Sequence, residues 1–93
     1  MIKAHGEIAE SALIHDGAAT FHGLNINTDG FTDVTATVYD GTSGNGKAVW
    51  RQTVRGQDNT GGAFFAAQGI AVETGVYVLI DGENCTVNAY YRV

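Results

Sequence analysis

The chain has 93 residues, of which ten are acidic and five basic, so its formal net charge is −5. This length allows one domain. The excess of acidic residues argues against binding to a nucleic-acid backbone. No apolar run approaches the roughly 18–20 residues of a membrane span. The first residues contain no long apolar stretch, so we expect no signal peptide and synthesis in a reducing cytoplasm. The single cysteine, Cys85, excludes an internal disulfide, so we expect oligomerisation to support so small a domain.

The first part of the chain predicts short strands separated by polar turns. Residues 1–10 mix apolar and charged side chains and predict either a strand or an arm that orders against a neighbouring molecule. Residues 11–15 predict a short strand that is closed by Asp16 and Gly17. A longer strand is expected over residues 18–26, and the stretch rich in Asn, Asp and Gly that follows it predicts a turn.

The middle of the chain contains the clearest strand pattern. Over residues 32–39, Val and Ala on one face alternate with Thr and Tyr on the other, as a half-buried strand requires. Residues 40–46 contain no apolar side chain and predict a loop. Because residues 47–54 alternate again, we expect a strand–loop–strand hairpin over residues 32–54.

The last part of the chain is the most apolar. Residues 55–62 predict a polar loop rich in glycine, 63–67 a compact apolar strand, and 70–73 a further short strand. Residues 76–80 are apolar on both faces, which predicts a central strand that is covered on both sides, or covered on its second side by another subunit. A polar turn separates this strand from a final strand over residues 85–93, and we expect the two to be antiparallel neighbours.

These elements predict an all-β protein. Roughly seven to nine short strands with frequent turns are typical of an antiparallel β-sandwich, here expected to be jelly-roll-like. No stretch of helical length shows an apolar period of 3.6 residues without glycine, so we expect almost no helix. Residues 1–10 are assigned to the N-terminal strand or arm, and residues 11–93 to a single β-sandwich domain.

Histidines are the first candidates for chemistry. His15 and His22 are separated by a predicted turn and could approach one another across it, with His5 completing a three-histidine metal site. No short ligand spacing supports such a site, and the alternative interpretation is that these are surface or interface histidines. Cys85 has no neighbouring histidine, and no serine lies in a nucleophile motif, so we expect no enzyme activity.

A calcium site is the second candidate. Asn25, Asn27 and Asp29 place oxygen atoms at alternate positions before Gly30, and further acids lie at Asp33 and Asp40. The bidentate glutamate of an EF-hand loop is missing, so an Asx-rich turn is the alternative interpretation. We therefore assign no metal and no cofactor to the chain.

Aromatic side chains suggest a binding surface. If the last strand is regular, its two consecutive tyrosines point to opposite faces, so that one of them is exposed. Packing in a core or at an interface is one interpretation of the aromatic residues, and a platform for sugars is the other. The residues concerned are Tyr39, Trp50, Tyr77, Tyr90 and Tyr91.

Several segments together carry a resemblance to a known family. The segment Thr-Val-Tyr-Asp-Gly-Thr (37–42) leads through a Gly/Asn loop into Lys-Ala-Val-Trp (47–50), and Phe-Phe (64–65) precedes Gly-Ile-Ala-Val (69–72). The chain then closes with Gly-Val-Tyr-Val-Leu-Ile-Asp-Gly (75–82) and a strand rich in tyrosine. From about residue 11 to the end, this pattern resembles small proteins of tailed bacteriophages that decorate or cement the capsid.

The resemblance implies a structural virion protein on the capsid surface, made in the host cytoplasm, and not an enzyme. It implies a homotrimeric β-sandwich that binds the major capsid protein between capsid subunits, with no nucleic-acid or membrane partner. The alternative is a carbohydrate- or receptor-binding β-module of a phage tail or fibre. The side chains that we expect at interfaces are Ile2, Phe64, Phe65, Tyr77, Leu79 and Tyr90.

Overall fold

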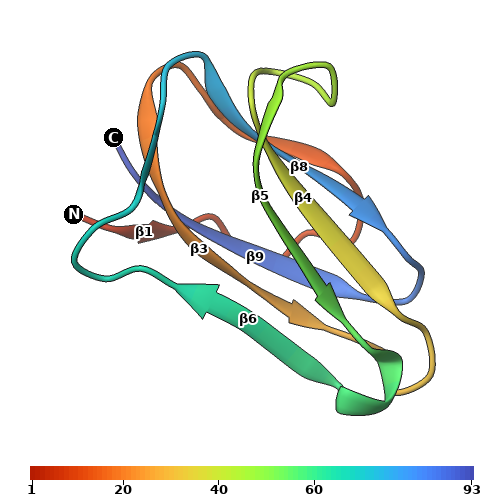
Figure 1. The fold of residues 1–93 in the computed structure, drawn as a ribbon. Coiled ribbons are helices and arrows are strands. Elements are labelled where there is room, and N and C mark those ends of the chain that lie inside the picture. Colours follow the sequence, from red (N-terminus) through yellow and green to blue (C-terminus); the bar gives the residue numbers. More distant parts are fainter.

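Two antiparallel β-sheets pack face to face in the computed structural model, which describes all 93 residues (Figure 1). Sheet A has the strand order β1-β9-β3-β6, with β7 also paired to β3, and sheet B has the order β2-β8-β4-β5. One 3₁₀ turn, Gly56–Asp58, is present, and no helix has the length and hydropathy required to cross a membrane. The expected all-β sandwich with almost no helix is confirmed. The strands are β1 (Lys3–Ala4), β2 (Ala12–Asp16), β3 (Ala19–Asn27), β4 (Val34–Asp40), β5 (Lys47–Val54), β6 (Thr60–Phe64), β7 (Ile70–Val72), β8 (Gly75–Asp81) and β9 (Thr86–Arg92).

The core lies between the sheets and is built from the apolar residues that alternate along the strands. Each strand places every second side chain on its inner face, so the predicted apolar face of β4 is buried as a unit. Full burial of a Val or Leu side chain stabilises the folded state by about 1.5–3 kcal/mol. The central strands contribute Phe21, Leu24, Ile26, Val34, Ala36, Val38, Val76, Val78, Val87 and Ala89 to this core.

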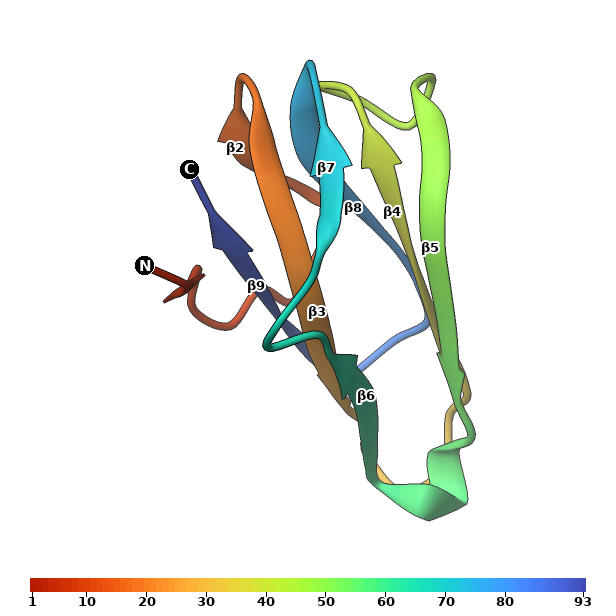
Figure 2. The same cartoon turned by 60° about the vertical axis from the view of Figure 1, so that its left-hand side comes forward.

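The connections between strands decide which residues share a sheet. The predicted hairpin over residues 32–54 is confirmed, because β4 and β5 are antiparallel neighbours in sheet B. β6 and β7 both pair with β3, at successive positions along it. Every other connection passes from one sheet to the other, and Figure 2 shows the two layers separately, with β3, β6 and β7 in one and β8, β4 and β5 in the other.

The predicted pairing of residues 76–80 with residues 85–93 is wrong. β8 pairs with β2 and β4 in sheet B, whereas β9 pairs with β1 and β3 in sheet A. The polar turn between them crosses the gap between the sheets, which is about 10 Å wide and which a few extended residues can span. A turn of this length suits a hairpin or a crossing equally well, so the local sequence does not distinguish the two.

The strand that was expected over residues 63–67 is displaced toward the N-terminus. β6 begins at Thr60, pairs with β3 through the glycines at 61 and 62, and ends at Phe64. A Cβ atom on Gly62 would lie 2.2 Å from the carbonyl oxygen of Leu24, so the absence of a side chain allows β6 to approach β3 closely. The glycines that suggested a loop are therefore part of the strand.

The first ten residues lie along β9 of the same chain. β1 pairs with β9 through Lys3 and Ala4, and Ile8 forms a further bridge to Val87, with each backbone N–H donating to the other residue's carbonyl oxygen at 2.8 Å. Ile2, expected at an interface, is half-buried beside β1. This segment covers the outer edge of sheet A.

Candidate functional site

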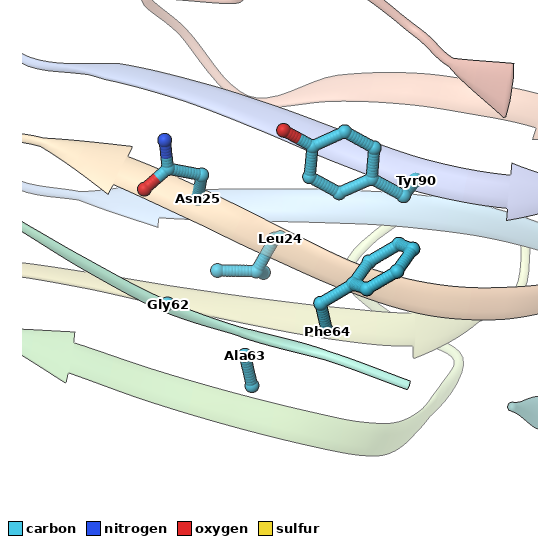
Figure 3. A pocket seen from close by; sticks show the side chains of 6 residues that line it. All are labelled: Leu24, Asn25, Gly62, Ala63, Phe64 and Tyr90. Atoms are coloured by element: carbon cyan, nitrogen blue, oxygen red, sulfur yellow. The ribbon is translucent and has the colours of Figure 1, made fainter. Parts of the chain in front are cut away.

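A concave surface lies on the outer face of sheet A, and we call it the aromatic groove (Figure 3). Its cavity volume is about 440 Å³. It is open to solvent, and no charged side chain lines it. The residues that form it are Leu24, Asn25, Gly62, Ala63, Phe64 and Tyr90.

The two aromatic residues of the groove stand on either side of a glycine in one row of the sheet. Gly23 of β3 pairs with Phe64 of β6 on one side and with Tyr90 of β9 on the other. It has a φ of +131°, and a Cβ atom there would lie 2.1 Å from the carbonyl oxygen of Ala63. Only glycine fits this conformation and this close contact. Because Gly23 has no side chain, the two rings meet above it, and the groove lies beside them over Asn25 and Gly62.

The two rings of the groove contact each other edge to face. The ring centroids of Phe64 and Tyr90 are 5.5 Å apart with an interplanar angle of 82°, a favourable aromatic geometry. Phe64 is 56% exposed, so part of its ring is open to solvent. Figure 3 shows the phenol of Tyr90 directed along the groove toward Asn25. Apolar ring surface therefore lies next to hydroxyl and amide groups.

The next row of sheet A supplies the polar end of the groove. Asn25 pairs with Gly62 on β6 and with Asn88 on β9. The side-chain oxygen of Asn25 accepts a hydrogen bond from the Thr60 hydroxyl at 3.2 Å, which leaves its amide NH₂ free to donate to a ligand. The side-chain oxygen of Asn88 accepts from the backbone N–H of Gly6 at 3.0 Å.

A buried histidine fixes one wall of the groove. His22 is an extra residue in β3 relative to β9, which makes it a β-bulge, and its side chain is buried. Its Nδ1 is hydrogen-bonded to the carbonyl oxygen of Phe65, and Arg92 approaches its Nε2 at 3.4 Å. Because a carbonyl only accepts, Nδ1 carries the proton and Nε2 accepts from the Nε–H of Arg92. These contacts hold the chain in place directly after Phe64.

A second exposed surface lies on the outer face of sheet B. Leu13, Tyr77 and Tyr39 stand side by side on β2, β8 and β4, and Leu79 follows in the next row, opposite Thr37. Leu13 is 39% and Leu79 is 37% exposed. We call these four apolar and aromatic residues, Leu13, Tyr39, Tyr77 and Leu79, the tyrosine–leucine face. None of the four is charged, but the row of Leu79 continues through Thr37 to Arg51, whose Nε–H donates to the Thr37 hydroxyl at 3.4 Å, and Asp81 lies in the row beyond.

Two aspartates stabilise the loops that connect the sheets. Asp29 accepts hydrogen bonds from the backbone N–H groups of Thr32 at 2.7 Å and Phe31 at 2.8 Å, and these bonds lower its pKa. Asp40 accepts from the backbone N–H groups of Thr74 at 2.9 Å and Glu73 at 3.1 Å, which lowers its pKa in the same way. Hydrogen bonds to the charged form of a carboxyl group favour that form.

The residues of the candidate calcium site do not converge. Asp29 and Asp40 are engaged with different loops, and Asp33 accepts from the backbone N–H of Gly56 at 2.9 Å. Asn25 belongs to the aromatic groove. The Asx-rich turn interpretation therefore describes Asp29, whose carboxylate caps its own loop.

The three histidines also occupy separate environments. His15 stacks on Tyr91 at a centroid distance of 5.5 Å, and His22 is buried in the β3 bulge. The His5 ring is hydrogen-bonded to the carbonyl of its neighbour Gly6. The structure contains no group of three or more His, Cys, Asp or Glu side chains arranged to hold a metal ion. Burial raises the pKa of the Cys85 thiol, which packs in the core.

The residues expected at interfaces fall into distinct groups. Phe64 and Tyr90 meet in the aromatic groove, while Tyr77 and Leu79 belong to the tyrosine–leucine face. Phe65 is different, because its ring is half-buried and packs edge to face on Trp50 at 4.9 Å, so we assign it to the core.

Sequence reasoning missed the residues whose role depends on pairing. Leu13 joins Tyr77 and Tyr39, which the sequence did suggest for a binding surface, only because β2, β8 and β4 are neighbours. Gly23 lies between two aromatic residues that are distant in the sequence. A glycine at the centre of a predicted strand is the one signal that pointed to the groove, since it often marks a bulge or a close approach.

No protein-family model matches the chain, and no curated protein or solved structure matches it significantly. The geometry of the aromatic groove and of the tyrosine–leucine face is therefore the main basis for a functional proposal.

Proposed function

We propose that this protein is a structural component of a bacteriophage particle that cements or decorates the capsid. It binds the major capsid protein between capsid subunits, as an oligomer that we expect to be a trimer. The observation that carries the proposal is the tyrosine–leucine face, a regular strand surface on which Leu13, Tyr77 and Tyr39 lie in one row. The resemblance in the sequence points to the same role.

The composition of this face suits contact with another protein. Tyrosine is enriched at the centres of interfaces, and such centres are depleted of charge. Beside the face, the hydroxyl groups of Thr35 and Thr53 are hydrogen-bonded to each other at 2.8 Å. Covering these four side chains with a partner desolvates no charge, and Arg51 and Asp81 stand at the border of the face. A protein that binds only the assembled shell stabilises that shell by mass action.

The test is co-sedimentation of the purified protein with undecorated capsids of the virus that encodes it. We expect saturable binding by the wild-type chain. Leu79→Lys places a charge on the face and should weaken binding roughly 30-fold or more, the effect of losing one important contact.

Ala71→Lys is the matched control, because Ala71 is exposed and its partner in the β7–β3 ladder is Thr20 of sheet A. This variant should bind as the wild type does. Absence of wild-type binding to the capsid, or equal binding by all three proteins, would contradict the proposal.

The aromatic groove supports a second candidate function, which is binding of a neutral glycan. Ligand sites are concave, largely apolar and carry a few oriented polar groups. Here Phe64 offers an exposed ring, and the Tyr90 hydroxyl and the Asn25 amide supply polar groups at the side of the groove. A surface without charge suits an uncharged ligand. This function would place the chain on a phage tail or fibre.

A glycan array followed by titration of any hit separates the two candidates. If the groove binds a sugar, Phe64→Ala should abolish binding by loss of ring contact, and Tyr90→Phe should weaken it roughly 10-fold by loss of one hydrogen bond. Leu79→Lys should leave glycan binding unchanged. No binding across the array, together with capsid binding, would exclude the second candidate.

A further inference from the structure

Two asparagines stand side by side at the polar end of the aromatic groove. Asn25 of β3 is paired directly with Asn88 of β9. Their chain neighbours Leu24 and Ala89 are buried in the core, so both asparagines point to the outer face of sheet A. Residues that are paired across antiparallel strands have Cβ atoms about 4.5–5.5 Å apart. The two amide groups can therefore contact the same small group of a bound molecule.

Each of these asparagines has its side-chain oxygen engaged and its NH₂ group free. The oxygen of Asn88 accepts from the backbone N–H of Gly6 at 3.0 Å, and this contact fixes the amide orientation because an NH₂ group cannot accept. The oxygen of Asn25 accepts from the Thr60 hydroxyl at 3.2 Å. The pair therefore offers NH₂ donors to a ligand and favours a ligand group that accepts hydrogen bonds.

A third asparagine on the same face is arranged differently. Asn27 lies one row further along β3, opposite Thr86, and its NH₂ group donates to the Thr86 hydroxyl at 3.4 Å. Its donor is thus used within the chain. The free amide donors of this face belong to the one row that borders the groove.

Apolar surface lies next to the free donors. Gly62 is the partner of Asn25 on β6, and Phe64 follows Gly62 on the same face of that strand. All three residues line the groove (Figure 3). Phe64 is 56% exposed, so a ligand seated over Gly62 contacts an aromatic ring on one side and an amide group on the other.

This arrangement fits an acceptor that carries a small apolar group. The acetamido group of an N-acetylated sugar has a carbonyl oxygen that accepts hydrogen bonds and a methyl group that can pack on a ring. A carboxylate also accepts, but no charged side chain lines the groove and the chain has a net charge of −5. A carboxylate would therefore lose its hydration without gaining a counter-charge. A sugar hydroxyl accepts as well but offers no methyl group to the ring.

We propose that the aromatic groove binds sugars that carry an acetamido group, the N-acetylhexosamines. The acetamido carbonyl accepts from the NH₂ groups of Asn25 and Asn88, and its methyl group packs against Phe64. The Tyr90 hydroxyl both donates and accepts, so it suits the acetamido N–H or a ring hydroxyl. The cavity of about 440 Å³ lies within the range of about 300–1,000 Å³ that is usual for ligand sites. The inference rests on the second proposed function and names its class of sugar.

The test is an NMR titration of the isotope-labelled protein with the methyl glycosides of N-acetylglucosamine and N-acetylgalactosamine. Each sugar is compared with its parent hexose and with the corresponding uronic acid. We expect an N-acetylated sugar to bind roughly 10-fold or more tightly than its parent, because a hydrogen bond and a methyl contact are gained. The side-chain NH₂ resonances of Asn25 and Asn88 should shift on binding, and that of Asn27 should not.

Two variants remove the donors without removing the contacts that hold the side chains. Asn25→Asp and Asn88→Asp keep an oxygen that accepts from Thr60 or Gly6 and replace only the NH₂ group. Each should weaken binding of the N-acetylated sugar roughly 10-fold or more. Asn27→Asp is the matched control, because it adds the same charge to the same face outside the groove, and it should bind as the wild type does. Circular dichroism and thermal melting establish that each variant is folded.

The outcomes distinguish this inference from the sugar-binding function on which it rests. Equal binding of the N-acetylated sugars and their parent hexoses, tighter binding of a uronic acid, or wild-type affinity in either Asn25→Asp or Asn88→Asp would overturn the inference and leave sugar binding in place. Absence of binding by every sugar would overturn both. Capsid binding through the tyrosine–leucine face is measured separately with Leu79→Lys.

Discussion

The outer faces of the two sheets are built on similar inner faces, yet their shapes differ. In sheet A the rings of Phe64 and Tyr90 meet above Gly23, and the aromatic groove lies beside them over Asn25 and Gly62. Sheet B has Tyr77 flanked by Leu13 and Tyr39 in the corresponding kind of row, with no glycine between them, and it forms the tyrosine–leucine face. The inner faces determine the fold, and the outer rows determine the function available to each side.

The comparison shows that an outward-facing glycine allows the side chains on either side of it to meet. In an antiparallel sheet, neighbours across strands lie about 5 Å apart, so each residue of a row limits the space of the next. Gly23 removes that limit and also requires glycine for its backbone conformation. A side chain at Gly23 would therefore both strain β3 and displace the two rings that border the groove.

The largest effect should come from adding a side chain at Gly23, beneath the two rings of the groove. Gly23→Ala forces a Cβ atom against the carbonyl of Ala63 and into a left-handed backbone region, so we expect the free energy of unfolding to fall by roughly 2–4 kcal/mol. Gly44→Ala is the matched control, because its Cβ would meet only Leu79 Cδ1 at 4.0 Å, and it should change stability by less than about 0.5 kcal/mol. Urea denaturation measures both, and equal stabilities would show that β3 tolerates a side chain there.

An intermediate effect is expected from acid, which acts on the connections between the two faces. Backbone hydrogen bonds lower the pKa values of Asp29 and Asp40 in the folded chain. Near the ordinary aspartate pKa of about 3.9, the unfolded chain therefore binds more protons than the folded chain does. This contribution to stability is fully present well above that pH and is lost as pH falls through the lower folded pKa values.

Thermal melting between about pH 6 and pH 2 measures this dependence. Asp40→Asn should lower stability at neutral pH and reduce the loss on acidification, because one of the two titrating groups is gone. An acid dependence that is identical in wild type and variant would show that Asp40 makes no contribution to it.

The smallest effects on stability should come from the exposed side chains that distinguish the faces. Phe64→Ala and Leu79→Ala each remove a partly exposed residue, so each should lower the free energy of unfolding by no more than about 1 kcal/mol. Their binding defects should differ, with Phe64→Ala affecting only a groove ligand and Leu79→Ala only capsid binding. A variant that impaired both would indicate that the two surfaces act as one.

Much of the local structure followed from alternation along single strands. The buried face of β4, the hairpin to β5 and the buried residues Val87 and Ala89 of β9 all have a period of two that is visible in the sequence. The separation of Tyr90 from Tyr91 to opposite faces follows from the same period, and the structure places Tyr90 in the groove and Tyr91 against the core. Local steric geometry fixes this alternation whatever the strand pairs with.

The functional surfaces required the tertiary structure. Whether β8 pairs with β9 or crosses to the other sheet is decided by long-range contacts, because the same short turn serves both. The sequence by itself determined which residues face inward and that the protein is all-β. Only the folded chain decided that two rings meet above Gly23 and that Leu13 joins Tyr77, since rows across a sheet join residues that are distant along the chain.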